Sequence, residues 1–311
     1  MGKFTFVAVI VMMALAARLH AAEDFESVWQ AYLSEHEVRK SIFNETHART
    51  KKHNSKKGVT FQMGHIAFSV LTSEEKKRHL GALKPVRPNS VVRGVARQAL
   101  PCSIDYRTDS CLPPVESIVL RDQGGCGSSW AHSATAVVEF GKCKKCDGTA
   151  LDLRLIVDCS REEGCSGGWE QEAWQYLASN GGQTDDSSYP YTTETRTCVF
   201  IPSDMSIGAE ISSSDPVEWV AWQDPTAMMT VLAGGRIISI FMQLPESFFS
   251  YEKYLLDAFF LSRSYAHAMN VVGYGTLDQN DYWVVRYSWS EGWEAAGYVL
   301  VRRSVDLCMI E

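Results

Sequence analysis

The nine residues Gln123-Gly124-Gly125-Cys126-Gly127-Ser128-Ser129-Trp130-Ala131 decide how this chain of 311 residues is interpreted. The three glycines predict a tight loop. The helical stripe that follows predicts a helix beginning near Ser129, with Trp130, Ser133, Ala134, Val137 and Val138 on one face. The N-terminus of a helix presents free N–H groups and a positive dipole end, which stabilise an anionic nucleophile or a developing oxyanion. The stretch is therefore a candidate nucleophilic site.

A histidine far downstream is the candidate partner of this helix end. Ala266-His267-Ala268 run into a strand-like stretch that reaches Gly275, and Trp283 and Ser288-Trp289 follow. A distant His that folds across to the helix N-terminus would act as a general base. Each of these pieces alone is weak evidence for catalysis.

The charge distribution excludes one class of function. The net charge of −7 divides into +8 for residues 1–100, with 16 basic and 8 acidic side chains, and −15 for the remainder. An acidic body of that size is a poor nucleic-acid binder, because phosphate neutralisation needs a basic face. A basic front and an acidic back instead predict two parts of one chain that dock on each other.

The N-terminus has the three-part form of a secretory signal peptide, which we predict over residues 1–22. Lys3 precedes the apolar run Phe4–Ala17, and Ala21-Ala22 end it. That run is too short to span a bilayer, so we expect no membrane association after its removal. All nine cysteines lie between Cys102 and Cys308. In an oxidising compartment they predict disulfides with one thiol left over.

Two different textures precede and follow Pro101. Before it, charged residues separate apolar residues at helical spacing, which predicts a helix up to about Lys51; the apolar positions are Phe25, Trp29, Tyr32, Val38, Ile42 and Phe43. Thr72 offers an N-cap for a short second helix. Lys84–Gln98 has no periodicity and is predicted to be an exposed, cleavable linker.

After Pro101, helices come first and strands later. A helix over Glu170–Ala178 follows the one at Ser129 and should stop at Asn180-Gly181-Gly182. The predicted strands are Ile237–Met242, Ala268–Tyr274, Tyr282–Tyr287 and Tyr298–Arg302. This order predicts an α+β fold with a helical lobe packed on a β lobe.

Together these motifs resemble the papain family of cysteine peptidases. The resemblance covers nearly the whole chain after the signal peptide, and its further motifs are Cys159, Gly164–Gly168, Tyr189-Pro190-Tyr191, Cys198, Trp293 and Gly297-Tyr298. It implies a two-lobed papain-like fold over residues 101–311 with a cleft between the lobes. An inhibitory helical propeptide would occupy residues 23–100, where Glu35, Arg39, Phe43, Asn54, Gly64 and Phe68 keep the family's spacing.

The departures from the family pattern bear on catalysis. By resemblance, Ser129 stands where the family has its nucleophilic Cys, and Tyr287 where it has the Asn that orients the catalytic His. Only His267 and the oxyanion-hole residue Gln123 remain. A Ser hydroxyl is not ionised in advance as a Cys thiol can be, and it needs a well-oriented base. A phenol cannot copy an amide oxygen, so the orientation of His267 is less controlled.

Two functions follow as the main alternatives, and a purely structural shell protein is a third that a cleft filled by side chains would favour. The one we favour is a papain-family homologue, secreted or endosomal and lysosomal, that has lost most or all peptidase activity. It would bind peptides or protein inhibitors in its cleft, with a decoy, regulatory or matrix role. The other is an active hydrolase that cleaves peptide bonds with Ser129 and His267, because Ser–His nucleophiles occur on other folds.

The expected binding residues follow partly from composition and partly from resemblance. Gly167 and Gly168 have no side chains to obstruct pairing with a peptide backbone. By resemblance, Ala268 would floor the main specificity pocket, and Trp289 and Trp293 would wall the primed side of the cleft. Trp169, beside the main pocket, would narrow it. Besides peptides, inhibitors and its own propeptide, we expect no partner, no cofactor and no metal.

Disulfide pairings also follow from the resemblance. The family pattern implies Cys126–Cys165 and Cys159–Cys198, and similarity to cathepsin B implies Cys111–Cys143. The Cys143-Lys-Lys-Cys146 spacing alone is also compatible with zinc or a redox thiol, although the export signal favours a structural disulfide. The pairing of Cys102, Cys146 and Cys308 stays open.

Overall fold

Helix α2 (Phe25–Asn54) is the first element of the computed structural model. The structure describes residues 25–83, 99–112, 123–145, 157–160, 164–185, 187–200, 204–212, 217–257, 264–289, 296–305 and 310. The predicted signal peptide and linker lie outside these residues. The chain divides into two compact units, Met1–Glu45 and Thr46–Glu311, so α2 begins in the first and ends in the second. In the first unit, Arg39 and Glu35 form an exposed ion pair one helical turn apart.

The predicted helix is confirmed, but it continues beyond Lys51. The side chain of Asn54, its last residue, donates to the carbonyl oxygen of Met63 at 2.8 Å and accepts from the Met63 N–H at 3.0 Å. Met63 ends strand β1 (Phe61–Met63). This contact fixes the end of the helix, which local charge patterning cannot reveal.

A short helix, α3 (Ser73–Arg78), follows β1 and the turn η1 (Ala67–Val70). Its predicted N-cap is confirmed, since the Thr72 hydroxyl accepts from the Glu75 N–H and the Glu75 carboxylate accepts from the Thr72 N–H. Residues 46–83, called the N-terminal segment below, therefore enter the second unit as ordered structure.

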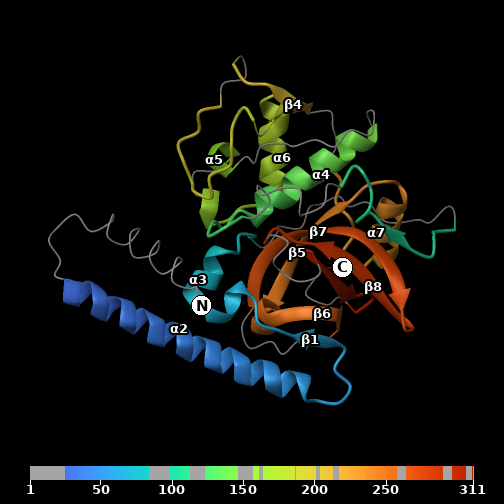
Figure 1. Cartoon of the computed structure of the whole chain (residues 1–311). Coiled ribbons are helices and arrows are strands. Elements are labelled where there is room, and N and C mark those ends of the chain that lie inside the picture. The colour runs from blue at the N-terminus through green and yellow to red at the C-terminus, as the bar shows by residue number, and fades with distance from the viewer. Residues whose placement is uncertain are drawn as a thin grey trace. The chain divides into compact units, whose positions relative to one another are not determined.

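The helical lobe forms around helix α4 (Ser129–Lys145), which begins where the sequence predicts. It packs with α5 (Val157–Ser160), η4 (Gly164–Ser166) and α6 (Glu170–Ser179), and the hairpin of β3 (Gly182–Thr184) and β4 (Ile207–Glu210) lies beside them. Figure 1 shows these helices grouped apart from the large sheet. The core of this lobe contains the buried side chains of Trp130, Ala134 and Leu177.

Three disulfides lie in this lobe or at its border, and all three implied pairings are confirmed. They are Cys111–Cys143, Cys126–Cys165 and Cys159–Cys198. Cys143 therefore does not pair with the nearby Cys146, which lies outside the described residues together with Cys308. Among the described cysteines, Cys102 is unpaired and exposed.

The β lobe is a seven-stranded sheet in the order β1-β6-β9-β8-β7-β2, with β5 also paired to β7. Its strands are β2 (Ile104–Asp105), β5 (Ile238–Pro245), β6 (Tyr251–Leu256), β7 (Ser264–Leu277), β8 (Asn280–Arg286) and β9 (Tyr298–Arg302). Helix α7 (Pro225–Ala233) and the turn η5 (Glu246–Ser250) complete it.

The four predicted strands correspond to β5, β7, β8 and β9, while β6 and α7 were not predicted. Tyr287 lies just after β8 rather than at its end. The observed order of helices and strands makes this a two-lobed α+β fold, as predicted. The two lobes meet where α4 packs against β7.

Candidate active site at the junction of the lobes

The N-terminus of α4 rests directly on strand β7. The backbone N–H of Ala268 donates a hydrogen bond to Ser129 Oγ at 3.2 Å, across 139 residues of sequence. Ser129 is fully buried, as are Ser128 and Gln123. The loop before the helix is tied down because the Gly127 N–H donates to the carbonyl oxygen of Cys165 at 2.8 Å. The sequence prediction that a distant strand carries His267 to this helix end agrees with this geometry.

His267, next to Ala268 on β7, is fully buried. Neither of its ring nitrogens has a hydrogen-bond partner within the residues that the structure describes, so no hydrogen bond joins it to Ser129. Burial, with the nearby charges of His132 and His79 adding to it, lowers the pKa of His267 to about 3. The imidazole is thus neutral, and no described residue forms a hydrogen bond with it.

An aromatic cluster encloses His267. The Tyr287 ring lies 5.6 Å from the His267 ring, centroid to centroid and nearly parallel, and the Trp289 ring lies at 4.7 Å. The Tyr287 ring also stacks on Phe248 at 5.0 Å, and Trp289 packs on Phe68 at 4.7 Å. Tyr287 therefore adds an aromatic surface beside the imidazole, and Trp289 remains buried.

Gln123 is held in place on both sides of its amide. Its Oε1 accepts from the Ser288 hydroxyl at 2.6 Å, and its Nε2 donates to the carbonyl oxygens of Cys126 at 2.9 Å and His79 at 2.8 Å. The Trp289 indole N–H donates to the same His79 oxygen at 2.9 Å. Two N–H donors thus converge on one carbonyl oxygen of the N-terminal segment.

The residues that follow His79 lie against the helical lobe as an extended strand. The Gly168 N–H donates to the carbonyl oxygen of Gly81 at 2.9 Å, and the Leu83 N–H donates to the Gly168 oxygen at 3.1 Å, which makes Ala82 a parallel bridge partner of Gly168. We call His79–Leu83 the cleft segment. The predicted ability of the Gly168 edge to pair with an extended backbone is therefore used by the chain itself.

The packing of the cleft segment leaves no room for side chains at two glycines. A methyl group on Gly81 would overlap the carbonyl oxygen of Gly127, and one on Gly127 would overlap the oxygens of Leu80 and Cys165. The cleft segment therefore lies directly over the loop that leads into Ser129.

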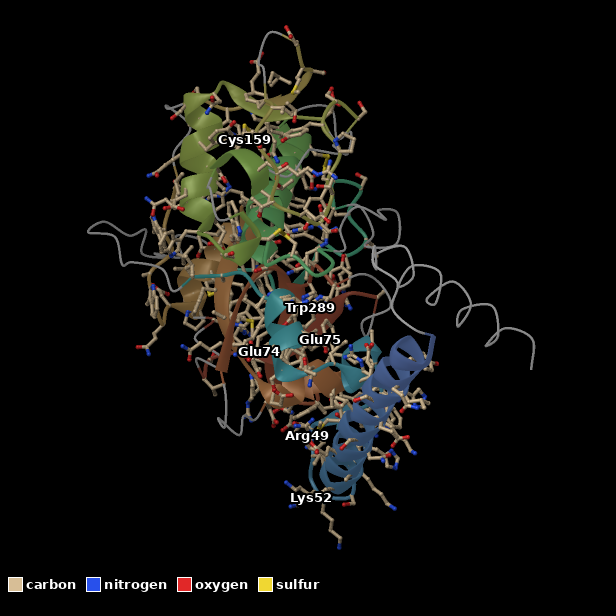
Figure 2. All side chains as sticks on the ribbon, turned by 90° about the vertical axis from the view of Figure 1, so that its left-hand side faces the viewer. Arg49, Lys52, Glu74, Glu75, Cys159 and Trp289 are labelled. Atoms are coloured by element: carbon tan, nitrogen blue, oxygen red, sulfur yellow. A yellow bond between two sulfur atoms is a disulfide. The ribbon has the colours of Figure 1, made fainter. Side chains whose placement is uncertain are left out.

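A buried ion pair anchors the helix before the cleft segment. Lys76 Nζ lies 2.7 Å from Glu246 Oε1, and Arg49 lies 3.9 Å from the same carboxylate oxygen. The Tyr265 hydroxyl donates to the other oxygen of Glu246 at 2.8 Å. In Figure 2, Trp289 lies close to α3, which carries Glu74 and Glu75, and Cys159 lies in the other lobe.

A polar network crosses the lobes beside this site. The Ser239 hydroxyl donates to Glu170 Oε1 at 3.1 Å and lies 2.6 Å from Ser133 Oγ. Asn270 Nδ2 donates to the oxygen and the hydroxyl of Ser133, both at 3.1 Å. Burial raises the pKa of Glu170 to about 7, although hydrogen bonds from its own N–H and from Ser239 oppose the shift. No sequence motif assigned a role at this site to Glu170, Ser239 or Ser288.

The other predicted residues fall as follows. Gly167, Gly168 and Ala268 are buried at the junction, and Trp169 is the N-cap of α6. His132, one turn after Ser128, packs inside the helical lobe with Nδ1 3.1 Å from the Ser128 oxygen. Trp293 lies outside the described residues. No group of three or more His, Cys, Asp or Glu side chains within the described ranges could hold a metal ion.

A two-lobed α+β fold whose junction is covered by the chain's own N-terminal segment is the architecture of a peptidase precursor of the papain class. Residues 100–311 match the family model described as papain family cysteine protease, so the chain belongs to this family. It is 32% identical to mouse cathepsin S over 285 residues, which cover 87% of this chain and 81% of that protein. It is 33% identical to digestive cysteine proteinase 3 of the lobster Homarus americanus over 259 residues, covering 80% and 76%.

Solved precursor structures share the fold over nearly the full chain. Digestive procathepsin L2 from Tenebrio molitor larval midgut superposes with a TM-score of 0.78 at 26% identity, covering 97% of this chain and 96% of that one. The recombinant stem bromelain precursor gives 0.77 at 25% identity, covering 98% and 95%. These precursors support the description of the N-terminal segment as the chain's own propeptide bound in the cleft.

Proposed function

We propose that this chain is a papain-family homologue that binds extended peptides or protein inhibitors in its cleft without cleaving them at a rate typical of the family. The observation that carries the proposal is the site itself. A serine hydroxyl occupies the helix N-terminus, and His267, next to the residue that donates to this hydroxyl, is enclosed by aromatic rings and has no hydrogen-bond partner among the described residues.

The chemistry of Ser129 supports weak or absent catalysis. A thiol near a helix N-terminus and a histidine can form a thiolate–imidazolium pair before attack, whereas a hydroxyl must lose its proton during attack. The base must then be positioned accurately, and none of the described residues is a polar partner that would fix the ring of His267. Tyr287 offers its ring face to His267 instead.

The cleft supports binding for a different reason. Gly168 already forms two backbone hydrogen bonds with the cleft segment, and Gln123 and Trp289 both donate to one of its carbonyl oxygens. These donors and acceptors recognise a peptide backbone rather than particular side chains. An extended peptide or the inserted segment of an inhibitor could take the place of residues 79–83.

We place the mature domain at residues 101–311, the propeptide at 23–100 and the signal peptide at 1–22, with the protein secreted or delivered to endosomes and lysosomes. Three disulfides support passage through the secretory pathway. Within the described residues no helix is long and apolar enough to cross a membrane.

The test compares wild type with Ser129→Cys after cleavage of residues 84–98. Both are assayed with a fluorogenic peptide, and binding of a cystatin-type inhibitor is measured by calorimetry. We expect inhibitor binding by both proteins and hydrolysis only by the variant. Hydrolysis by wild type at a rate like that of family peptidases would overturn the proposal in favour of a Ser129–His267 hydrolase. Absence of inhibitor binding at micromolar concentration would remove the binding role.

A matched control removes the exposed thiol. Cys102 is the unpaired cysteine among those described, so Cys102→Ser should be combined with both proteins. Any thiol-dependent signal that remains in the Cys102→Ser protein with Ser129 intact cannot arise from the candidate site.

A further inference from the structure

Glu170 is a partly buried acidic side chain that the proposed binding mode does not use. It is the first residue of α6, whose inward face continues through Ala173 and Trp174, and the Trp174 indole N–H donates to the Ala134 oxygen at 3.2 Å. Residues one turn apart on a helix lie on the same face. Glu170, one turn before Trp174, therefore projects into the junction of the lobes, where it meets Ser239.

Ser239 and Ala268 lie on the same face of the sheet. Burial alternates along β5, so Ser239 and Phe241 share the face opposite to the β-lobe core. Ser239 pairs with Asn270, and Phe241 pairs with Ala268, in antiparallel register. Directly opposed residues point to the same side, and diagonal neighbours such as Ser239 and Ala268 are about 7–8 Å apart.

Ala82 of the cleft segment packs against the same face of the sheet. It is buried in one apolar cluster with Ala268, against which Phe241 packs. Its bridge partner, Gly168, lies two residues before Glu170. A side chain longer than a methyl group at position 82 would extend over the sheet face that carries Ser239. The Glu170 carboxylate accepts from Ser239 at that face.

The carboxylate of Glu170 has one side-chain donor, Ser239, and no described cation forms an ion pair with it. A carboxylate can accept several hydrogen bonds, and a buried one is stabilised most by a cation that also donates to it. The raised pKa is the expected consequence of burial without such a counter-charge.

We propose that Glu170 is a specificity-determining residue that selects lysine or arginine at the peptide position that replaces Ala82. The aliphatic stem would lie over Phe241 and Ala268, and the cationic end would reach the carboxylate. This inference rests on the proposed peptide-binding function and adds the class of peptide that the cleft prefers.

The cleft segment provides a built-in peptide for the test. Ala82→Lys and the similarly sized but uncharged Ala82→Leu are made in the full chain, each with Glu170 and with Glu170→Gln. The readout is hydrogen exchange of the Leu83 amide, which donates to Gly168 and reports release of the segment. A circular dichroism melt checks that each variant is folded.

We expect hydrogen exchange of the Leu83 amide to be roughly fivefold slower in Ala82→Lys than in Ala82→Leu. A partly exposed ion pair between the lysine at position 82 and Glu170 would contribute up to about that factor. The difference should vanish in the Glu170→Gln background. An equal difference in both backgrounds, or loss of protection with Ala82→Lys and also with Ala82→Arg, would overturn the inference. A purely structural role for Glu170 would lower protection equally whatever residue occupies position 82.

The results of this experiment can be separated from those that test the proposed function. Exchange at Leu83 requires no catalysis and no external ligand. Peptide hydrolysis by wild type would end the proposed function and leave a measured coupling between residues 82 and 170 intact. Conversely, zero coupling with normal inhibitor binding would remove only the lysine and arginine preference.

Discussion

At the scale of single residues, we expect Tyr287 to limit the activity that a thiol nucleophile at position 129 can give. Ser129→Cys returns a thiol to the N-terminus of α4 beside Gln123, so thiolate formation and oxyanion stabilisation become possible. His267 would still have no polar partner among the residues that the structure describes, and it lies beside the Tyr287 ring. A base misplaced by about 1 Å can cost around a hundredfold in rate.

We therefore expect the double variant Ser129→Cys with Tyr287→Asn to exceed Ser129→Cys in kcat/KM by about a hundredfold. Tyr287→Asn alone is the control and should remain inactive, since it supplies no thiol. If the single variant already matched an active relative, Tyr287 would not be a second lesion.

The candidate site was only partly predictable at this scale. Gln123, Ser129, His267 and Tyr287 could be proposed because sequence motifs mark them. Ser288 and Glu170 could not, because their importance arises from partners 165 and 69 residues away. The position of Ser288 directly before Trp289 was the available signal for its contact with Gln123.

At the scale of elements, the cleft segment depends on the absence of a side chain at Gly81. Gly81→Ala forces a methyl group onto the carbonyl oxygen of Gly127. Such overpacking costs about 1–3 kcal/mol, so the Leu83 amide should lose about tenfold in exchange protection or more. Gly125→Ala is the matched control, because a methyl group there meets open space. Equal protection in both variants would show that the segment moves aside without cost.

The disulfide Cys111–Cys143 ties the start of the mature region to the end of α4. The two residues are 32 positions apart, and closing a loop of that length in the unfolded chain contributes about 3–4 kcal/mol to stability. We expect Cys111→Ser with Cys143→Ser to lower the free energy of unfolding in urea by about that amount. Cys102→Ser, which removes an unpaired thiol, should change it little; a similar loss in both would point to a role for Cys102.

Element prediction succeeded where the local pattern was strong. The start of α4 and both ends of β9 follow from apolar periodicity and flanking residues. Strand β6 was missed because three consecutive residues in its middle, Glu252–Tyr254, are exposed, which hides the alternation. Helix α7 could have been found, since Asp224 caps it and Pro225 begins it.

At the scale of the whole molecule, one ion pair links propeptide docking to pH. Burial raises the pKa of Glu246, but the hydrogen bond and charge of Lys76, helped by Tyr265 and Arg49, outweigh it and hold the pKa below its ordinary value of 4.5. A depressed carboxyl pKa stabilises the folded state fully above pH 4.5 and less as the pH falls through the folded value.

We expect the urea midpoint of the full chain to fall as the pH drops from 6 to below 4.5, and Lys76→Met to weaken this dependence. At pH 6 the variant should lose about 3 kcal/mol, because it leaves a largely buried carboxylate with a weaker partner. Lys77→Met is the control, since the exposed pair of Lys77 with Glu74 should contribute about 0.5 kcal/mol or less. A pH dependence identical in wild type and Lys76→Met would refute the role of this pair.

The two-lobed architecture itself was predictable, because helices precede strands after Pro101 and the family motifs fix their order. The opposite charges of the two parts also predicted docking. Which charges meet could not be predicted, since Lys76 and Glu246 are separated by 170 residues and approach only in the folded chain.

Strand β1 pairs with β6 at the outer edge of the seven-stranded sheet, opposite the side on which β6 meets β9. Removal of residues 23–100 would leave β6 as an unpaired edge strand with unsatisfied amides and carbonyls, and Tyr254 in this strand is already 54% exposed. Such edges recruit strands from neighbouring molecules. We therefore expect the protein without residues 23–100 to self-associate more strongly than the full chain as its concentration rises. A synthetic peptide that contains Phe61–Met63 and its flanking residues should suppress this association, because it would cover the edge of β6 again.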